Sequence, residues 1–157
     1  MPTGAIDSAL EDQVSDTVLL PREVLERFQQ SSIDKSIDEM LDLYAEDAVY
    51  EFPFTPPGMP SRLDGRAEIR GFLEANWESA PLRYQAYRNV VVHETSDPEV
   101  IIVEQDATGT VTTTGRAVTL PNIVVLRVRD GRIVHIRDYV NVLAAAEAIG
   151  LQITPDV

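Results

Sequence analysis

The chain has 157 residues and a mass of 17.4 kDa, the size of one domain that buries roughly two thirds of the surface exposed by its unfolded form. Its 13 basic and 26 acidic residues give a formal charge of -13, which repels phosphate backbones and anionic lipids. We therefore expect no nucleic-acid or membrane partner. The absence of cysteine excludes disulfides, thiolate metal sites and cysteine nucleophiles. Without a membrane-length apolar run or a secretory pattern, we expect a soluble cytoplasmic protein.

The N-terminal region divides into an acidic tail and two short helices. Residues 1–20 contain four acidic residues and no basic one, which indicates a mobile tail before a single domain over residues 21–157. Pro21 suits a first helical turn, and the apolar residues that follow it are spaced as on a helix. Ser36 and Glu39 form a capping-box pattern, which predicts a second helix with Tyr44 on its apolar face.

In the middle and at the end of the chain, the spacing of the apolar residues changes from one typical of helices to one typical of strands. Residues 48–54 are typical of a short strand, and residues 66–78 carry one apolar stripe of a third helix. The remainder is rich in β-branched and aromatic residues broken by turn signals, which predicts strands over residues 84–93, 100–106, 110–119, 122–129 and 132–142. Helices followed by a strand meander indicate an α+β domain with the helices on one face of an antiparallel sheet.

Asp138 lies in an apolar row of the last predicted strand. Side chains alternate across a strand, so Asp138 shares a face with Ile136 and Val140, whereas His135 and Tyr139 lie on the other. A carboxylate among aliphatic neighbours is either satisfied by local hydrogen bonds or functional, and both readings stay open here. In a dry pocket its pKa rises toward neutrality, which suits general acid/base catalysis.

The other candidate residues are less sharply defined. Glu104 is a second candidate acid, but both faces of its strand are apolar, so a salt bridge at the rim is equally compatible with the pattern. Some aromatic and amide side chains could line a cavity, although core packing explains them as well. These are Tyr44, Tyr50, Trp77 and Asn122. Two separated histidines, dispersed glycines and no cysteine predict no metal site and no organic cofactor.

Several segments carry a family resemblance. Residues 43–48 leading into the first strand, residues 130–133 leading into the last, and the segments 94–98, 103–104 and 137–141 resemble the NTF2-like superfamily, and within it the SnoaL-like and PhzA/PhzB proteins. The resemblance covers residues 21–142. It implies a cone of three N-terminal helices packed on a strongly curved, mostly antiparallel sheet, an apolar pocket, and a homodimer formed through the outer sheet face, where Ile133, Tyr139, Ile123 and Val125 are expected.

The resemblance also carries site residues. Asp138 matches a pocket glutamate of the PhzA/PhzB proteins, whereas Phe72 replaces their pocket histidine. Phe28 and Phe52 replace the catalytic tyrosine and aspartate of the ketosteroid isomerases, which argues against that mechanism. Limonene-type epoxide hydrolases are an alternative, because Tyr50 and Asp138 match their water-positioning tyrosine and catalytic aspartate. Phe52 and Gln105 replace the asparagine and arginine of that site, with Asp106 nearly in register for the second aspartate.

We therefore predict a pocket protein for a small, hydrophobic, ring-containing metabolite. It is expected to be an enzyme of isomerase, cyclase or condensing type, with Asp138 and Glu104 as catalytic residues. The predicted substrate-binding residues are Tyr44, Tyr50, Phe52, Phe72, Trp77 and Asn122. A noncatalytic ligand-binding or protein-docking domain is the alternative from another class.

Overall fold

The computed structural model describes residues 17–151. The predicted tail lies outside the described residues except for residues 17–20, as does the end of the predicted domain, residues 152–157. The described elements are α1 (Pro21–Asp34), α2 (Ile37–Leu41), β1 (Tyr44–Glu51), β2 (Arg62–Asp64), α3 (Arg66–Phe72), the π-helical turn η1 (Leu73–Trp77), β3 (Leu82–Glu94), β4 (Val100–Val111), β5 (Ala117–Arg129), β6 (Arg132–Val140) and α4 (Val142–Ala148).

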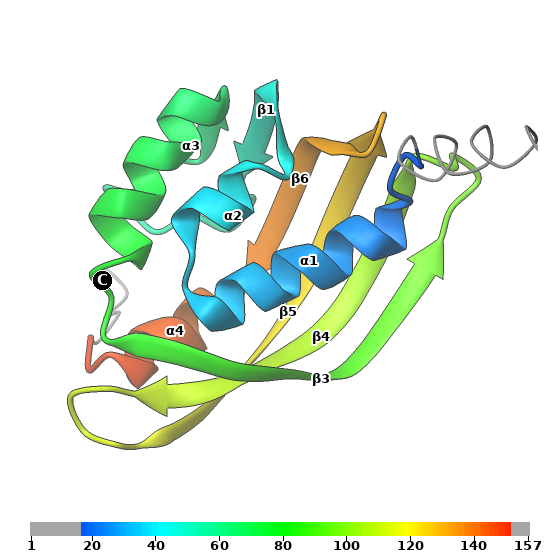
Figure 1. Ribbon diagram of the computed structural model, residues 1–157. Coiled ribbons are helices and arrows are strands. Elements are labelled where there is room, and N and C mark those ends of the chain that lie inside the picture. Colours follow the sequence, from blue (N-terminus) through cyan, green and yellow to red (C-terminus); the bar gives the residue numbers. More distant parts are fainter. Residues whose placement is uncertain (1–16, 152–157) are drawn as a thin grey trace, which may run out of the picture.

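The strands form one mixed sheet in the order β2-β1-β6-β5-β4-β3. Neighbouring strands are antiparallel except β1 and β6, which run parallel. The sheet bends around α1, which crosses one face with α2 and α3 beside it, and α4 follows the end of β6 (Figure 1). The predicted α+β cone is confirmed, with α4 and η1 as additions. No helix within residues 17–151 is long and apolar enough to cross a membrane.

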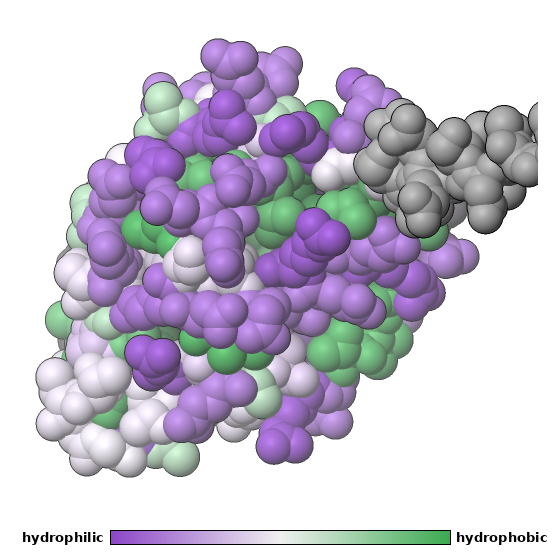
Figure 2. All heavy atoms as spheres, viewed as in Figure 1, coloured by the Kyte–Doolittle hydropathy of each residue, from purple (hydrophilic) through white to green (hydrophobic). Residues whose placement is uncertain are grey.

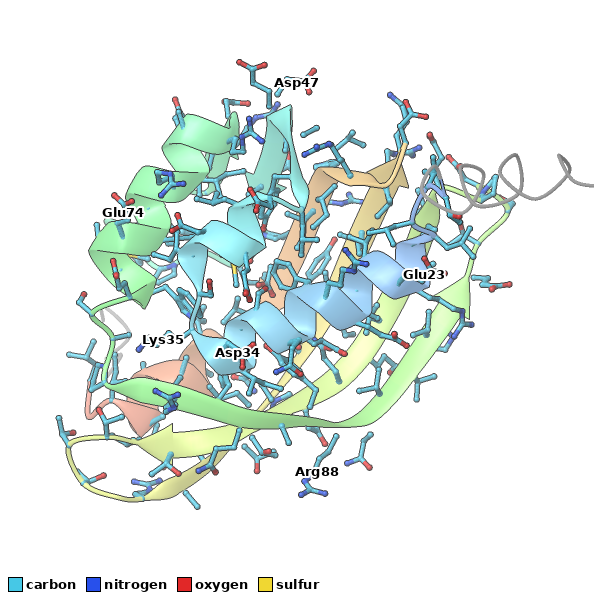
Figure 3. The ribbon with its side chains drawn as sticks, in the orientation of Figure 1. Glu23, Asp34, Lys35, Asp47, Glu74 and Arg88 are labelled. Carbon is cyan, nitrogen blue, oxygen red and sulfur yellow. The ribbon has the colours of Figure 1, made fainter. Side chains whose placement is uncertain are left out.

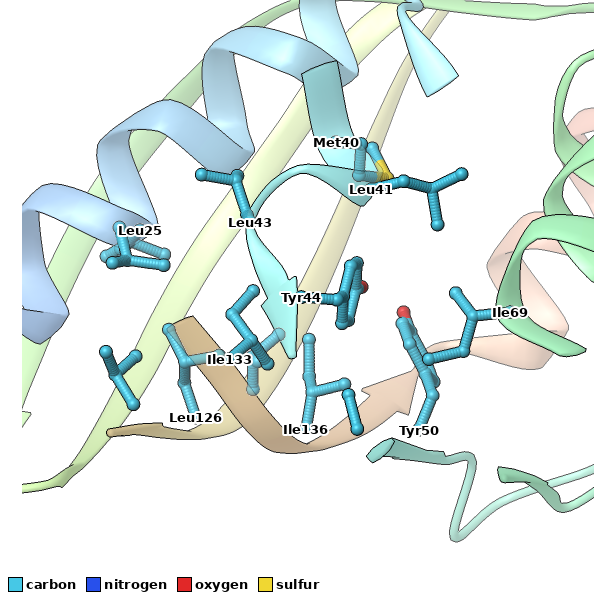
Figure 4. Close-up of a cluster of buried hydrophobic side chains, with 14 of the residues drawn as sticks. Leu25, Met40, Leu41, Leu43, Tyr44, Tyr50, Ile69, Leu126, Ile133 and Ile136 are labelled. Atoms are coloured by element: carbon cyan, nitrogen blue, oxygen red, sulfur yellow. The ribbon is translucent and has the colours of Figure 1, made fainter. Parts of the chain in front are cut away.

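The core lies between the helices and the inner face of the sheet. Its largest fully buried side chains come from α1, α3 and four strands, and several are shown in Figure 4: Tyr44, Ile69, Leu126, Ile133, Ile136, Val24 and Val103. Charged side chains such as Glu23, Asp34 and Glu74 project outward (Figure 3), and the helical side of the molecule is mainly hydrophilic (Figure 2). This segregation follows the apolar stripes read from the sequence.

The helix starts are as predicted. Pro21 is the first residue of α1, and Ser36 caps α2 by accepting a hydrogen bond from the Glu39 backbone N–H at 3.3 Å. The predicted third helix is present, but its second half is the π-helical turn η1. Tyr44 was expected on the second helix and instead begins β1, because α2 ends at Leu41.

Two long strands replace three predicted ones. Residues 100–129 form β4 and β5, joined by a turn at residues 112–116. The turn expected near residue 109 is absent because Gly109 serves strand packing. A Cβ there would lie 2.2 Å from the Arg83 carbonyl oxygen, so only glycine allows β3 to approach this closely. The sequence pattern could not distinguish this use of glycine from a turn.

A bulge in β6 corrects one predicted face. The pairing of β5 with β6 shifts between Arg127 and Val128, so that Val128 pairs with Ile133 and Arg127 with His135. The extra residue, Val134, breaks the alternation at this point. Ile133 is therefore fully buried in the core and not on the outer face as predicted, whereas residues from His135 onward keep their predicted sides.

Candidate functional site

A cavity of about 170 Å³ lies between the helices and the inner face of the sheet, where Asp138 of β6 reaches it. Asp138 is the only carboxylate among the described lining residues, which include no lysine, arginine or histidine. The lining comprises Phe28, Ser32, Met40, Tyr50, Leu73, Trp77, Leu82, Tyr84, Tyr87, Gln105, Ala107, Leu120, Pro121, Asn122, Val124, Asp138, Val140, Asn141 and Ala145. The site is thus a mainly apolar pocket lined by one acid group and three amide side chains, those of Gln105, Asn122 and Asn141.

Two side chains hold the Asp138 carboxyl. The Tyr50 hydroxyl donates to Oδ2 at 2.7 Å, and Asn122 Nδ2 donates to Oδ1 at 3.1 Å. Burial raises the pKa of Asp138 above its ordinary value of 3.8, although both hydrogen bonds favour the ionised form. Burial, followed by the field of Asp138, raises the pKa of Tyr50 well above 10.0, so Tyr50 keeps its proton for this bond. The carboxyl is oriented but deprived of water, which suits proton transfer.

Two tyrosines of β3 form an aromatic wall that strand alternation alone does not predict. Tyr84 and Tyr87 are three residues apart, yet both line the cavity with ring centroids 6.0 Å apart. The pairing of β3 with β4 shifts between Tyr84 and Ala86, and this bulge at Gln85 turns Tyr87 to the inner face. Burial raises the pKa of Tyr87 to about 12, so it stays protonated.

Trp77 closes another side of the cavity from the end of η1. Lys35, just after α1 and in the left-handed conformation with φ 54°, donates from Nζ to the Ala80 and Leu82 carbonyl oxygens at 2.9 and 3.1 Å. Its ammonium lies 5.9 Å from the Trp77 ring centroid. Lys35 therefore ties α1 to the segment that carries Trp77, a contact that sequence spacing does not reveal.

Gln105 is a buried polar lining residue that was not among the predicted site residues. It lies on the inner face of β4 between Val103 and Ala107 and is 6% exposed. Gln29 of α1 donates from Nε2 to Gln105 Oε1 at 2.7 Å. The signal that found Asp138, a polar residue in an apolar row, is also present at Gln105.

The predicted substrate-binding residues divide into two groups. Tyr50, Trp77 and Asn122 line the cavity. Tyr44, Phe52 and Phe72 do not; they pack in or against the core behind it. The Phe52 ring stacks between Tyr50 and Phe72, with centroids 4.6 and 5.3 Å away. The structure thus assigns Tyr44, Phe52 and Phe72 to packing in place of ligand contact.

Glu104 is separated from Asp138 by the thickness of the sheet. Alternation along β4 turns Gln105 inward and Glu104 and Asp106 to the outer face. Glu104 Oε2 lies 2.7 Å from His93 Nε2, and both side chains are about half exposed. This geometry corrects the prediction that Glu104 joins the site, because the strand pleat places it on the wrong side.

The second histidine is also outside the cavity. His135 Nε2 lies 3.3 Å from a carboxylate oxygen of Glu51 on the outer side of β6 and β1. Within residues 17–151, no three histidine or acidic side chains gather as a candidate metal site.

The sequence matches a known domain family and two bacterial relatives. Residues 23–136 match the SnoaL-like domain. The protein YesE of Bacillus subtilis is 34% identical over 128 residues, which are 82% of this chain and 86% of YesE. A PhzA/B-like protein of Pseudomonas aeruginosa is 37% identical over 109 residues, 69% of this chain and 75% of that protein. Neither relative has a characterised activity.

Solved structures share the fold. A proposed isomerase from Bacillus subtilis superposes with a TM-score of 0.78 at 31% identity, covering 86% of this chain and 96% of its own. A phenazine biosynthesis-related protein from Pseudomonas aeruginosa gives 0.62 at 21% identity, covering 100% and 93%. The ketosteroid isomerase of a Mycobacterium gives 0.65 at 22% identity, covering 80% and 97%. The last two likenesses concern the fold alone.

Proposed function

Because this chain belongs to the SnoaL-like domain family, we propose that it catalyses a proton-transfer reaction on a small, uncharged, ring-containing metabolite, with Asp138 as the acid/base. One observation carries the proposal. Asp138 is the sole carboxylate lining the cavity within the described residues, and it is held by Tyr50 and Asn122. An isomerisation, a cyclisation and a condensation all begin with such a proton transfer from carbon.

The surroundings of Asp138 support acid/base chemistry. A general base works best when its pKa approaches the ambient pH, and burial moves the pKa of Asp138 in that direction. Within residues 17–151 the lining supplies no cation to hold the carboxyl permanently ionised. Asp138 can therefore accept a proton from a bound substrate and return it.

The size of the cavity limits the substrate. A volume of about 170 Å³ is only a little more than the roughly 150 Å³ that accommodates benzene. Trp77, Tyr84 and Tyr87 offer ring faces for stacking. A single substituted six-membered ring fits this space. Because the described lining residues include no basic side chain, a carboxylated or phosphorylated ligand is disfavoured.

The outward position of Asp106 weakens the epoxide hydrolase alternative. The limonene-type enzymes that the sequence resembles use two carboxylates bridged by an arginine. Here Asp106 faces outward, where it accepts a hydrogen bond from Asn89 at 2.8 Å, and the inward position is occupied by Gln105. The cavity is consequently equipped for a one-carboxylate mechanism.

The test is hydrogen exchange into a small ring ketone. Cyclohex-2-enone is incubated with the protein in deuterated water, and deuterium incorporation at carbon is followed by NMR. Wild type should accelerate exchange and Asp138→Asn should abolish the acceleration. Glu104→Gln, which alters a carboxylate on the opposite face, is the matched control and should retain it. Binding of the enone without any accelerated exchange would instead support a noncatalytic ligand-binding domain.

We also propose that two copies pair through the outer face of the sheet. This face carries a hollow of about 960 Å³ with Ile102, Ile123, Val125 and Tyr139 among its lining residues. Ile123 is 43% exposed and Val91 46%, so both add apolar surface to the lining of this hollow. Light scattering should give twice the chain mass, and Ile123→Glu should convert the dimer to a monomer; a wild-type monomer would contradict the proposal.

A further inference from the structure

The amide of Gln105 is held in one orientation at the cavity wall. Its Oε1 accepts the hydrogen bond from Gln29 Nε2 at 2.7 Å, which leaves Nε2 of Gln105 as the free end. No hydrogen bond within residues 17–151 uses that Nε2. An amide N–H without a protein acceptor in a largely apolar cavity is available to a ligand acceptor.

Gln105 stands close to the acid group. It pairs directly with Asn122 across β4 and β5, so the two side chains lie next to each other on the inner face, with Cβ atoms about 5 Å apart. Asn122 in turn donates to Asp138 at 3.1 Å. A free donor and a proton acceptor therefore line the same cavity, with Asn122 as their common neighbour.

We infer that Gln105 Nε2 binds the carbonyl oxygen of the substrate, that Gln29 is the residue positioning it, and that the substrate class is uncharged cyclic ketones and enones. The inference rests on the proposed function of Asp138. It adds a second contacting residue on β4 and a positioning residue on α1, 76 residues apart in sequence.

The step balances without another reactant. The Asp138 carboxylate removes a proton from the carbon next to the carbonyl group. The C–H electron pair forms a carbon–carbon double bond, and the carbonyl π pair moves onto oxygen, giving an enolate. Gln105 Nε2 donates a hydrogen bond to that oxygen, where negative charge develops. Asp138 then returns the proton to the same or a conjugated carbon, which restores the carboxylate.

The experiment uses cyclohex-2-enone and cyclohex-2-enol as probes with the full chain. Trp77 is the only tryptophan and lines the cavity, so its fluorescence reports binding. The infrared carbonyl stretch of bound enone reports the hydrogen bond to its oxygen, and deuterium incorporation reports proton transfer. In wild type the stretch should lie below that of the enone in an apolar solvent.

Gln105→Leu should return the stretch to its apolar-solvent value, weaken enone binding about 5-fold, and slow exchange about 100-fold.

Gln29→Glu keeps the Gln105 side chain and tests the same idea if Gln105→Leu does not fold. A carboxylate at position 29 accepts from Gln105 Nε2 and turns Oε1 toward the cavity. This variant should lose the lowered stretch and prefer the enol, which donates, over the enone. Gln30→Glu adds the same charge at an exposed neighbouring position and should behave as wild type.

The outcomes separate the two proposals. In one outcome, the carbonyl stretch of bound enone is lowered in wild type and not in Gln105→Leu, but wild type does not accelerate deuterium exchange. This result would support the Gln105 contact and reject the acid/base function of Asp138. In another outcome, deuterium exchange requires Asp138, but Gln105→Leu changes neither the carbonyl stretch nor the exchange rate. This result would overturn the proposed contact between Gln105 and the carbonyl oxygen. Enone that leaves Trp77 fluorescence unchanged would overturn the substrate class, and an unaltered enone preference in Gln29→Glu would overturn the positioning role.

Discussion

Two buried tyrosines of β1 should respond in opposite directions to loss of the hydroxyl. Tyr44 is fully buried, and its hydroxyl has no hydrogen-bond partner within residues 17–151. A buried, unpaired hydroxyl costs about 1–3 kcal/mol relative to one in water. Phenylalanine keeps the ring in place, including its edge contact with Phe28 at 6.4 Å. Tyr44→Phe should therefore raise the free energy of unfolding by about 1–3 kcal/mol.

Tyr50→Phe is the matched comparison. The Tyr50 hydroxyl donates to the Asp138 carboxylate at 2.7 Å, and a hydrogen bond to a charged group contributes about 1.5–3 kcal/mol. Its loss should lower the free energy of unfolding by that amount at neutral pH and raise the pKa of Asp138 further. For a chain of this length each kcal/mol corresponds to about 2–4 °C in Tm.

Urea unfolding at neutral pH, followed by circular dichroism, measures both variants against wild type. Equal denaturant slopes would show that the compared states are the same and that the differences are differences in stability. If Tyr44→Phe destabilised the protein as much as Tyr50→Phe, the Tyr44 hydroxyl would have a partner, for example an internal water. The reasoning about unpaired burial would then be refuted.

Three further changes follow from the structure. The raised pKa of Asp138 means that the native state holds the Asp138 proton more tightly than the unfolded chain does. The free energy of unfolding of wild type should therefore fall as the pH rises from the unfolded through the folded pKa of Asp138. Urea titrations at several pH values should show this decline in wild type and not in Asp138→Asn. Gly109→Ala should cost about 1–3 kcal/mol because backbone must move, whereas Gly71→Ala, with open space around it, should be neutral or stabilising in the same assay. Lys35→Met should shift Trp77 emission, and an unchanged spectrum would show that the ammonium does not contact the ring.

The features that sequence could predict are those decided within one segment. Pro21 and Ser36 mark helix starts through local hydrogen bonding, and the period of two placed Asp138 on the inner face of β6. The family resemblance added the cone. Both kinds of information are carried by short stretches of chain.

The features that sequence could not predict depend on a neighbouring strand. The bulges at Gln85 and Val134 exist only in the pairing of β3 with β4 and of β5 with β6. They turn Tyr87 into the cavity and Ile133 into the core, and no pattern within a single strand indicates either change. Gln105 was detectable by the argument used for Asp138, but its bond to Gln29 requires knowledge of where α1 lies.

The parallel pairing of β1 with β6 has a consequence for how the molecule folds. Tyr50 and Asp138, joined by one hydrogen bond, are 88 residues apart in the chain. A nascent polypeptide cannot make this contact until β6 has been synthesised, and closing so long a loop is entropically costly before the intervening strands have paired. We therefore expect Asp138 to leave water in a late step of folding, so that the rate of the slowest refolding phase changes with pH between the unfolded and the folded pKa of Asp138.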